Sequence, residues 1–208
     1  MKSKSGERTL LASVVLSSPG PIVVGVGLLL GRSSTQLADF LRRTAELVAI
    51  IVSWLIFRII NKEGTKDAIW KAKLEGIANL CVGLTMCFSG AAMVLIAFLS
   101  ENTAKGNVLP GLVIAILGVI TNSWFWFRYR NLNKVEPNVI LAVQSKLYRA
   151  KSLVDACVTA ALVSIVVSPG STISYYMDIV GSIVVAIYLL INGVMTLSKQ
   201  KFNKTGTI

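Results

Sequence analysis

Six apolar runs, each long enough to cross a lipid bilayer, constrain this sequence more than any other feature. A transmembrane helix needs about 20 consecutive apolar residues, and such runs recur along the 208 residues of the chain. They cover residues 10–31, 36–60, 74–100, 108–127, 139–167 and 175–197. We therefore expect a single all-α membrane domain of six transmembrane helices that occupies residues 1–208.

The composition excludes the usual classes of soluble protein. Apolar residues make up 54% of the chain and charged residues 15%, whereas soluble domains average about 25% charged residues. The chain has no histidine, and its three cysteines all lie inside apolar runs without forming a Cys-x-x-Cys pair. Neither a disulfide scaffold nor a thiolate zinc site is expected. We expect a membrane protein that is not an enzyme and carries no cofactor.

The basic residues fall mainly in the short gaps between apolar runs, and their distribution predicts the orientation. Lys and Arg in short loops stay in the cytoplasm, and fourteen of them lie at the two termini or in and beside the 61–73 and 128–137 gaps. They are Lys2, Lys4, Arg8, Arg58, Lys62, Lys66, Lys71, Lys73, Arg128, Arg130, Lys134, Lys199, Lys201 and Lys204. The opposite gaps hold Arg32 and Lys105. We therefore expect a multi-pass protein of the cytoplasmic membrane, in contact with its lipids, with both termini in the cytoplasm and no nucleic-acid partner.

Proline inside the first apolar run predicts a break in its helix. Pro19 and Pro21 lack the backbone N–H that a continuous helix requires. Membrane helices tolerate such breaks when neighbouring groups satisfy the freed carbonyls. We expect the helix over residues 10–31 to kink at this point.

Two of the six runs carry several ionisable residues each, and such residues are costly in a bilayer and usually face a cavity or a partner. The run at 36–60 carries Asp39, Arg42, Arg43 and Glu46, and the run at 139–167 carries Lys146, Tyr148, Arg149, Lys151, Ser152 and Asp155. At helical spacing these residues form polar stripes. Ion pairs of Arg42 with Glu46 and of Lys151 with Asp155 would explain them as packing devices. We favour stripes that line a translocation path, because two separate helices carry them.

Four segments resemble, in their order and spacing, the transmembrane domain of the cation diffusion facilitator family. Residues 33–39 resemble the start of that family's second span, and residues 71–75 the start of its third. Residues 148–155 lie where the fifth span carries a His-x-x-x-Asp metal motif, and residues 178–188 resemble a run in the sixth. The resemblance covers nearly the whole chain. It implies a six-helix bundle that exports zinc or other divalent cations by proton antiport, as a homodimer.

The family's metal-ligand positions carry different residues in this chain. The resemblance places the second-span ligands at Arg42 and Glu46 and the fifth-span ligands at Tyr148 and Ser152, so three of the four positions lack a typical ligand. Because zinc prefers imidazole and thiolate ligands, we expect weak zinc binding within the membrane. Few residues follow the sixth run, so the family's cytoplasmic C-terminal domain is not expected here.

These positions predict a site between the second and fifth spans. The candidates for substrate binding or coupling are Asp39, Arg42, Glu46, Tyr148, Ser152 and Asp155. Glu46 would exchange the substrate for a proton, with Arg42 as its counter-charge. Tyr148 and Ser152 would supply oxygen ligands, and Asp155 would join Glu46 as a candidate metal ligand. Such ligands favour a divalent cation such as Mn²⁺ or Mg²⁺ as the small ion substrate.

Two alternatives to a cation transporter are open from the sequence. The same fold could carry an anion or a zwitterion, because Arg42, Arg43 and Lys151 would attract negative charge. The chain could also be a transport-inactive relative that serves as a structural or assembly partner. Flux of a divalent cation, flux of an anion, and silence across a panel of substrates distinguish the three.

The charge distribution makes the orientation testable. A reporter enzyme that is active only outside the cytoplasm should be inactive when it is fused after Ile208, because the C-terminus is expected in the cytoplasm. The same reporter inserted in the 101–107 gap should be active. High activity of the C-terminal fusion would contradict the orientation.

Overall fold

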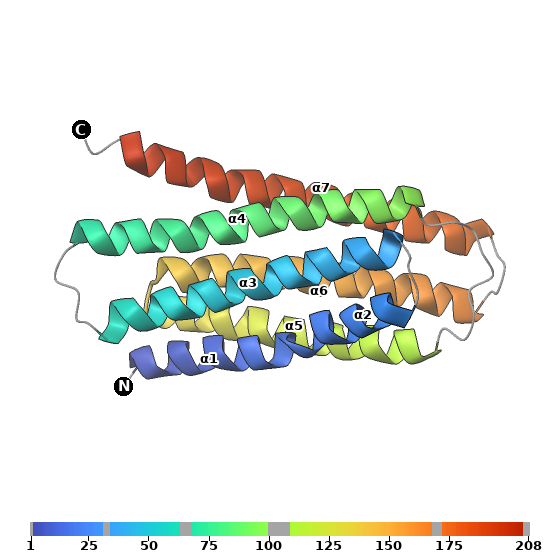
Figure 1. Cartoon of the computed structure of the whole chain (residues 1–208), viewed down its shortest axis with the longest axis horizontal. Coiled ribbons are helices and arrows are strands. Elements are labelled where there is room, and N and C mark those ends of the chain that lie inside the picture. The colour runs from blue at the N-terminus through green and yellow to red at the C-terminus, as the bar shows by residue number, and fades with distance from the viewer. Residues whose placement is uncertain (1, 31–33, 63–67, 100–108, 168–171, 206–208) are drawn as a thin grey trace.

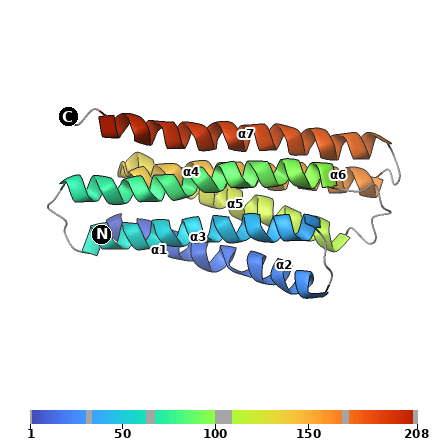
Figure 2. The same ribbon diagram turned by 45° about the horizontal axis from the view of Figure 1, so that its top comes forward.

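The computed structural model describes residues 2–30, 34–62, 68–99, 109–167 and 172–205. Within these ranges the chain forms only helices and no strand, so the expected all-α fold is confirmed. The helices are α1 (Lys2–Ser17), α2 (Pro19–Leu30), α3 (Ser34–Lys62), α4 (Ala68–Leu99), α5 (Leu109–Val135), α6 (Val139–Val167) and α7 (Thr172–Thr205). They run side by side along one long axis (Figure 1), and a second view gives the same arrangement (Figure 2).

The first expected span consists of two helices, which confirms the break predicted at Pro19. Helix α1 ends at Ser17 and α2 begins at Pro19. Because Pro19 has no N–H, it leaves the carbonyl of Val15 without its usual helical donor. The Ser18 hydroxyl donates to that carbonyl at 2.8 Å. The side chain therefore replaces the missing backbone hydrogen bond and lets the chain bend there.

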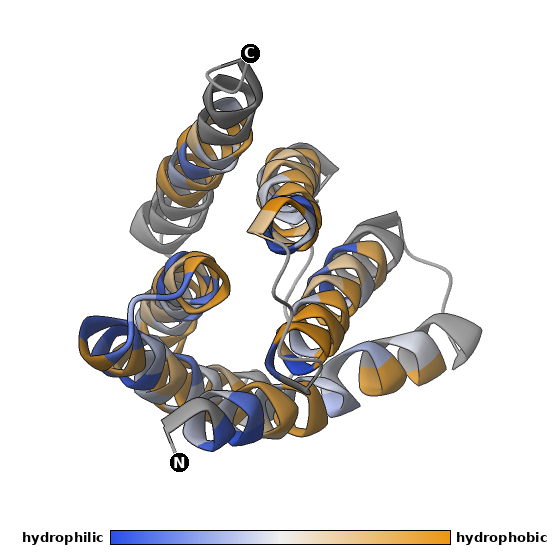
Figure 3. Cartoon of the chain, turned by 90° about the vertical axis from the view of Figure 1, so that its left-hand side faces the viewer, coloured by the Kyte–Doolittle hydropathy of each residue, from blue (hydrophilic) through white to orange (hydrophobic). Residues whose placement is uncertain are grey.

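The chain passes up and down the bundle an even number of times. Helix α1 begins and α7 ends at the same end of the molecule, on the left of Figure 1. Helix α3 ends and α4 begins there too, and so does the turn between α5 and α6. Viewed from this end, hydrophilic residues gather on near helix ends and hydrophobic residues dominate farther along (Figure 3). The strongly basic gaps of the sequence thus adjoin one end of the bundle.

Three helices contain a described stretch that is long and apolar enough to cross a membrane by length and composition. These stretches are Phe40–Asn61, Ala68–Leu95 and Leu112–Val135, and α7 contributes the shorter apolar stretch Ile183–Ser198. Helix α6 has 29 residues, which is sufficient length, but the half that begins at Val139 carries three basic residues and its middle carries Asp155. Helices α1 and α2 are each too short because the proline break divides them.

Helices α4 and α7 approach each other closely through small residues. A Cβ atom added to Gly193 of α7 would lie 2.5 Å from Sγ of Cys87 and 3.0 Å from the carbonyl oxygen of Gly83, both on α4. A Cβ at Gly90 of α4 would lie 3.0 Å from the carbonyl oxygen of Ala186 on α7. Small residues allow such backbone contact between membrane helices, where van der Waals packing drives association. The pair therefore forms a closely packed unit at the side of the bundle.

Substitution tests this close approach. Gly193→Ala places a methyl group against backbone atoms of α4 that cannot move aside alone, and should lower the free energy of unfolding by about 1–3 kcal/mol. Denaturation of the purified protein in mixed micelles measures the change. The matched control is Ala91→Val, which enlarges an exposed position of α4 and should have little effect. Equal stability of Gly193→Ala and the unaltered chain would contradict the packing described.

Candidate functional site

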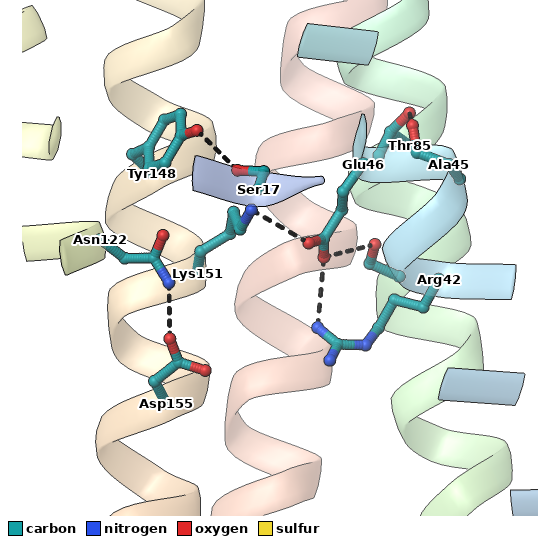
Figure 4. A network of polar contacts seen from close by, with 10 residues as sticks. Ser17, Arg42, Ala45, Glu46, Thr85, Asn122, Tyr148, Lys151 and Asp155 are labelled. Atoms are coloured by element: carbon teal, nitrogen blue, oxygen red, sulfur yellow. Dashed lines mark hydrogen bonds and ion pairs between the residues drawn. The ribbon is translucent and has the colours of Figure 1, made fainter. Parts of the chain in front are cut away.

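Glu46 lies at the centre of a buried polar cluster where α3, α4 and α6 meet (Figure 4). Its Oε1 accepts hydrogen bonds from Nη1 of Arg42 at 3.2 Å and from Oγ of Ser89 at 3.3 Å. Its Oε2 lies 3.4 Å from Nζ of Lys151. The Glu46 side chain is only 7% exposed, so its charge must be stabilised by these partners. A single carboxylate thus connects three helices.

The ion pair of Arg42 with Glu46 has the geometry expected from helical spacing, since the two residues stand one turn apart on α3. Lys151 differs from the packing alternative considered above. Its ion pair in the structure is with Glu46 on another helix, whereas its partner along α6 would have been Asp155. The Lys151 ammonium also lies 5.1 Å from the centre of the Tyr148 ring. Two cationic side chains therefore share one carboxylate.

The other polar residues of α6 contact helices on different sides of it. The Asp155 carboxylate accepts a hydrogen bond from Nδ2 of Asn122 at 2.6 Å, and the Ser152 and Ser123 hydroxyls lie 2.6 Å apart; both partners are on α5. The Tyr148 hydroxyl lies 3.2 Å from that of Ser17 on α1. Hence the candidate ligands do not all point at one place: Glu46 is the group on which three helices converge.

A second buried polar layer lies between Glu46 and the end of the bundle at which both termini lie. Gln144 of α6 donates through Nε2 to Oγ of Ser53 on α3 at 2.8 Å. Tyr129 of α5 donates to Oγ of Ser13 on α1 at 2.7 Å. All four side chains are fully buried. This layer ties α6 to α3 and α5 to α1 through uncharged side chains.

Aromatic rings of α5 pack against Tyr148 of α6, beside the polar cluster. Phe125 lies 5.0 Å from Tyr148 between ring centres, and Tyr129 lies 5.4 Å from Tyr148. Such contacts restrain ring orientation. Tyr148 therefore contacts two aromatic rings and the ammonium of Lys151, which together restrain its ring.

Several members of the cluster were not among the candidates named from the sequence. Ser89 contacts Glu46, and Asn122 and Ser123 contact the polar residues of α6. Each interrupts an otherwise apolar run, and this was the available signal. Asp39 lies on α3, but its side chain is outside the described part of the chain, so the role expected for it stays a prediction.

The chemistry of the cluster is that of a charge-balanced site. Two cations, Arg42 and Lys151, and two carboxylates, Glu46 and Asp155, lie within electrostatic range of one another. Within the part of the chain that the structure describes, no three carboxylate, thiol or imidazole groups gather as they would in a preformed metal site. Glu46 and Asp155 are separate carboxylates here, each already engaged with other side chains.

Comparison with protein families decides the wider class. The family model described as the cation efflux transmembrane domain matches residues 10–201. The chain belongs to the cation efflux family. No curated protein sequence matches the chain. The resemblance noted from the sequence is thereby confirmed, and so is a membrane-embedded, multi-pass architecture that transports a cation across the membrane. Members of the cation efflux family are transporters that work within the bilayer.

The shared carboxylate makes a stability prediction. Glu46→Leu would remove the buried carboxylate that both Arg42 and Lys151 contact, and should destabilise the protein by about 3–5 kcal/mol. The double change Arg42→Met with Glu46→Leu also takes from the Lys151 ammonium the carboxylate that it contacts in this structure. If that ammonium finds no other carboxylate, adding Lys151→Met as a third change should recover most of the loss.

Denaturation in mixed micelles measures all three variants. The control is Glu136→Leu, which removes an exposed carboxylate at a helix end and should change the free energy of unfolding by less than about 0.5 kcal/mol. A double variant as stable as the triple variant would mean that the Lys151 ammonium finds another partner, such as Asp155, when Glu46 is gone.

Proposed function

We propose that this cation efflux protein is a secondary transporter that exchanges a divalent cation for protons, with Glu46 as the coupling carboxylate. The observation that carries the proposal is the position of Glu46, buried and contacted by Arg42, Lys151 and Ser89 from three helices. A carboxylate in such a position can bind a cation or a proton, but only if its own partners yield. An exchange of partners at Glu46 would therefore accompany substrate binding.

Alternating access is the mode of transport that this arrangement supports. In transporters of this kind, substrate sites lie near the middle of the bilayer and helices rock around them. The ion pair of Glu46 with Lys151 lies between α3 and α6 and is buried in the bundle. If this ion pair broke at one stage of the transport cycle and reformed at a later stage, substrate binding would be coupled to helix movement.

The available ligands favour a hard divalent cation. Glu46 and Ser89 offer carboxylate and hydroxyl oxygen atoms, and Tyr148, Ser152 and Asp155 lie within about one turn of Lys151 on α6. Oxygen ligands suit Mn²⁺ or Mg²⁺, whereas zinc prefers nitrogen and sulfur. We propose that the protein works as a homodimer in the cytoplasmic membrane, with both termini in the cytoplasm, on the basis of the family and the basic loops.

A second candidate substrate is an anion or a zwitterion. It is favoured by one observation, namely that Arg42 and Lys151 both contact the single carboxylate of Glu46. If Glu46 were displaced, both cationic groups would be available to a negatively charged group. The transport assay below includes this case.

Flux into proteoliposomes tests the function. The purified chain, with an imposed pH gradient, should take up Mn²⁺, and Glu46→Gln should reduce uptake to that of empty liposomes because the exchangeable carboxylate is lost. The control Glu136→Gln removes an exposed carboxylate outside the cluster and should transport normally. Uptake of Mn²⁺ that is unchanged by Glu46→Gln would exclude Glu46 as the coupling residue. Uptake of an anion in place of Mn²⁺ would favour the second candidate.

A further inference from the structure

Both oxygens of the Glu46 carboxylate are already bound by groups of the protein. Arg42 and Ser89 contact Oε1, and the ammonium of Lys151 lies 3.4 Å from Oε2. An ammonium on a carboxylate oxygen makes the same kind of contact as a substrate cation would make there. In this conformation the protein's own cation therefore occupies the position of the substrate.

Of the two cations on Glu46, Lys151 is the one that can leave without a change in α3. Arg42 lies on the same helix as Glu46, one turn away, so its contact is local. Lys151 reaches Glu46 from α6 on a flexible four-carbon stem. Its side chain is 14% exposed. Rotation of that stem is enough to free Oε2, while Arg42 and Ser89 still hold Oε1.

A second carboxylate stands within reach of the displaced ammonium. Asp155 lies one turn from Lys151 on α6, the spacing at which Lys and Asp side chains meet. Its Oδ2 accepts a hydrogen bond from Asn122, which leaves Oδ1 out of that bond. A Cβ atom at Gly118 would lie 2.7 Å from Oδ2, so glycine at that position makes room for the carboxylate. Asn122 and α5 thus fix Asp155 as an alternative anionic partner.

We propose that Lys151 is an internal competitor of the substrate: it binds Glu46 when the site is empty and moves to Asp155 when a cation takes its place. The inference rests on the proposed function, since it assigns the cation to Glu46. In both positions the ammonium has a carboxylate partner, so the exchange leaves no buried charge unpaired.

This competition selects for the charge of the substrate. A cation must replace an ammonium that is tethered at the site and therefore present at high effective concentration. A divalent ion has twice the Coulomb attraction of a monovalent ion for the same carboxylate at the same distance. Lys151 would therefore exclude Na⁺ and K⁺ while it admits a divalent cation at reduced affinity.

Calorimetric titration of the purified full-length chain with Mn²⁺ tests the proposal. Lys151→Gln should lower the dissociation constant for Mn²⁺ by about tenfold or more, because the competing charge is gone. Lys151→Met, which keeps a stem of similar length, should do the same if Gln impairs folding. The control Lys134→Gln removes an exposed charge at the end of α5 and should leave the constant unchanged. An unchanged or higher dissociation constant in both Lys151 variants would overturn the proposal.

A double-mutant cycle separates the two roles that Asp155 could have. As the receiving partner of Lys151, Asp155 matters only while Lys151 is present, so Asp155→Asn should weaken Mn²⁺ binding in the unaltered chain but not in Lys151→Gln. As a direct ligand it would weaken binding equally in both. Equal weakening would overturn the movement to Asp155.

The same measurements distinguish this inference from the proposed function. If Lys151→Gln gains Mn²⁺ affinity while the unaltered chain shows no proton-coupled Mn²⁺ flux, the proposed function fails and the competitor role stands. If the unaltered chain transports Mn²⁺ but the Lys151 variants gain no affinity, the competitor role fails alone. Inhibition of Mn²⁺ binding by Na⁺ in Lys151→Gln, and not in the unaltered chain, would support the selection by charge.

Discussion

The ionised carboxylate of Glu46 in the bundle interior is the constraint on which the rest of the structure depends. A buried charge without partners costs several kcal/mol, and the Glu46 side chain is nearly enclosed. One partner, Arg42, comes from the same helix, but Ser89 and Lys151 bring α4 and α6 to it. The relative rotation of three helices is thereby specified, because each must present one particular side chain to the same two oxygen atoms.

Helix α6 forms polar contacts with several other helices of the bundle. Along one length of α6, Gln144 bonds to α3, Tyr148 to α1, and Asp155 to α5. In an apolar medium, van der Waals packing alone leaves helix rotation loosely defined, whereas each polar bond restricts it. Lys151 and Asp155, two of the charged residues that lower the hydropathy of α6, are among the residues that bind its neighbours. The charged residues of α6 thus lower its hydropathy but also provide contacts that hold it in the bundle.

The parts of this arrangement that depend on local spacing could be predicted from the sequence, and the parts that depend on helix contacts could not. The break at Pro19 follows from a missing N–H, and the pair of Arg42 with Glu46 follows from one helical turn. Lys151 had two carboxylates at plausible distances, and periodicity along α6 favoured Asp155. Its contact with Glu46 requires the relative height of α3 and α6, which no spacing within one helix encodes. Ser89 and Asn122 were missed for the same reason.

The two kinds of helix contact in the bundle indicate where movement can occur. Helices α4 and α7 meet backbone to backbone at Gly83, Gly90 and Gly193, where little can shift without a clash. The backbones of α3 and α6 make few direct contacts, and their link is made by side chains, chiefly Lys151 on Glu46 and Gln144 on Ser53. A side-chain link can exchange partners while each buried charge stays neutralised, whereas a close-packed glycine contact cannot. Rearrangement around Glu46 is therefore expected to separate α3 from α6 and to carry α4 and α7 along as one body.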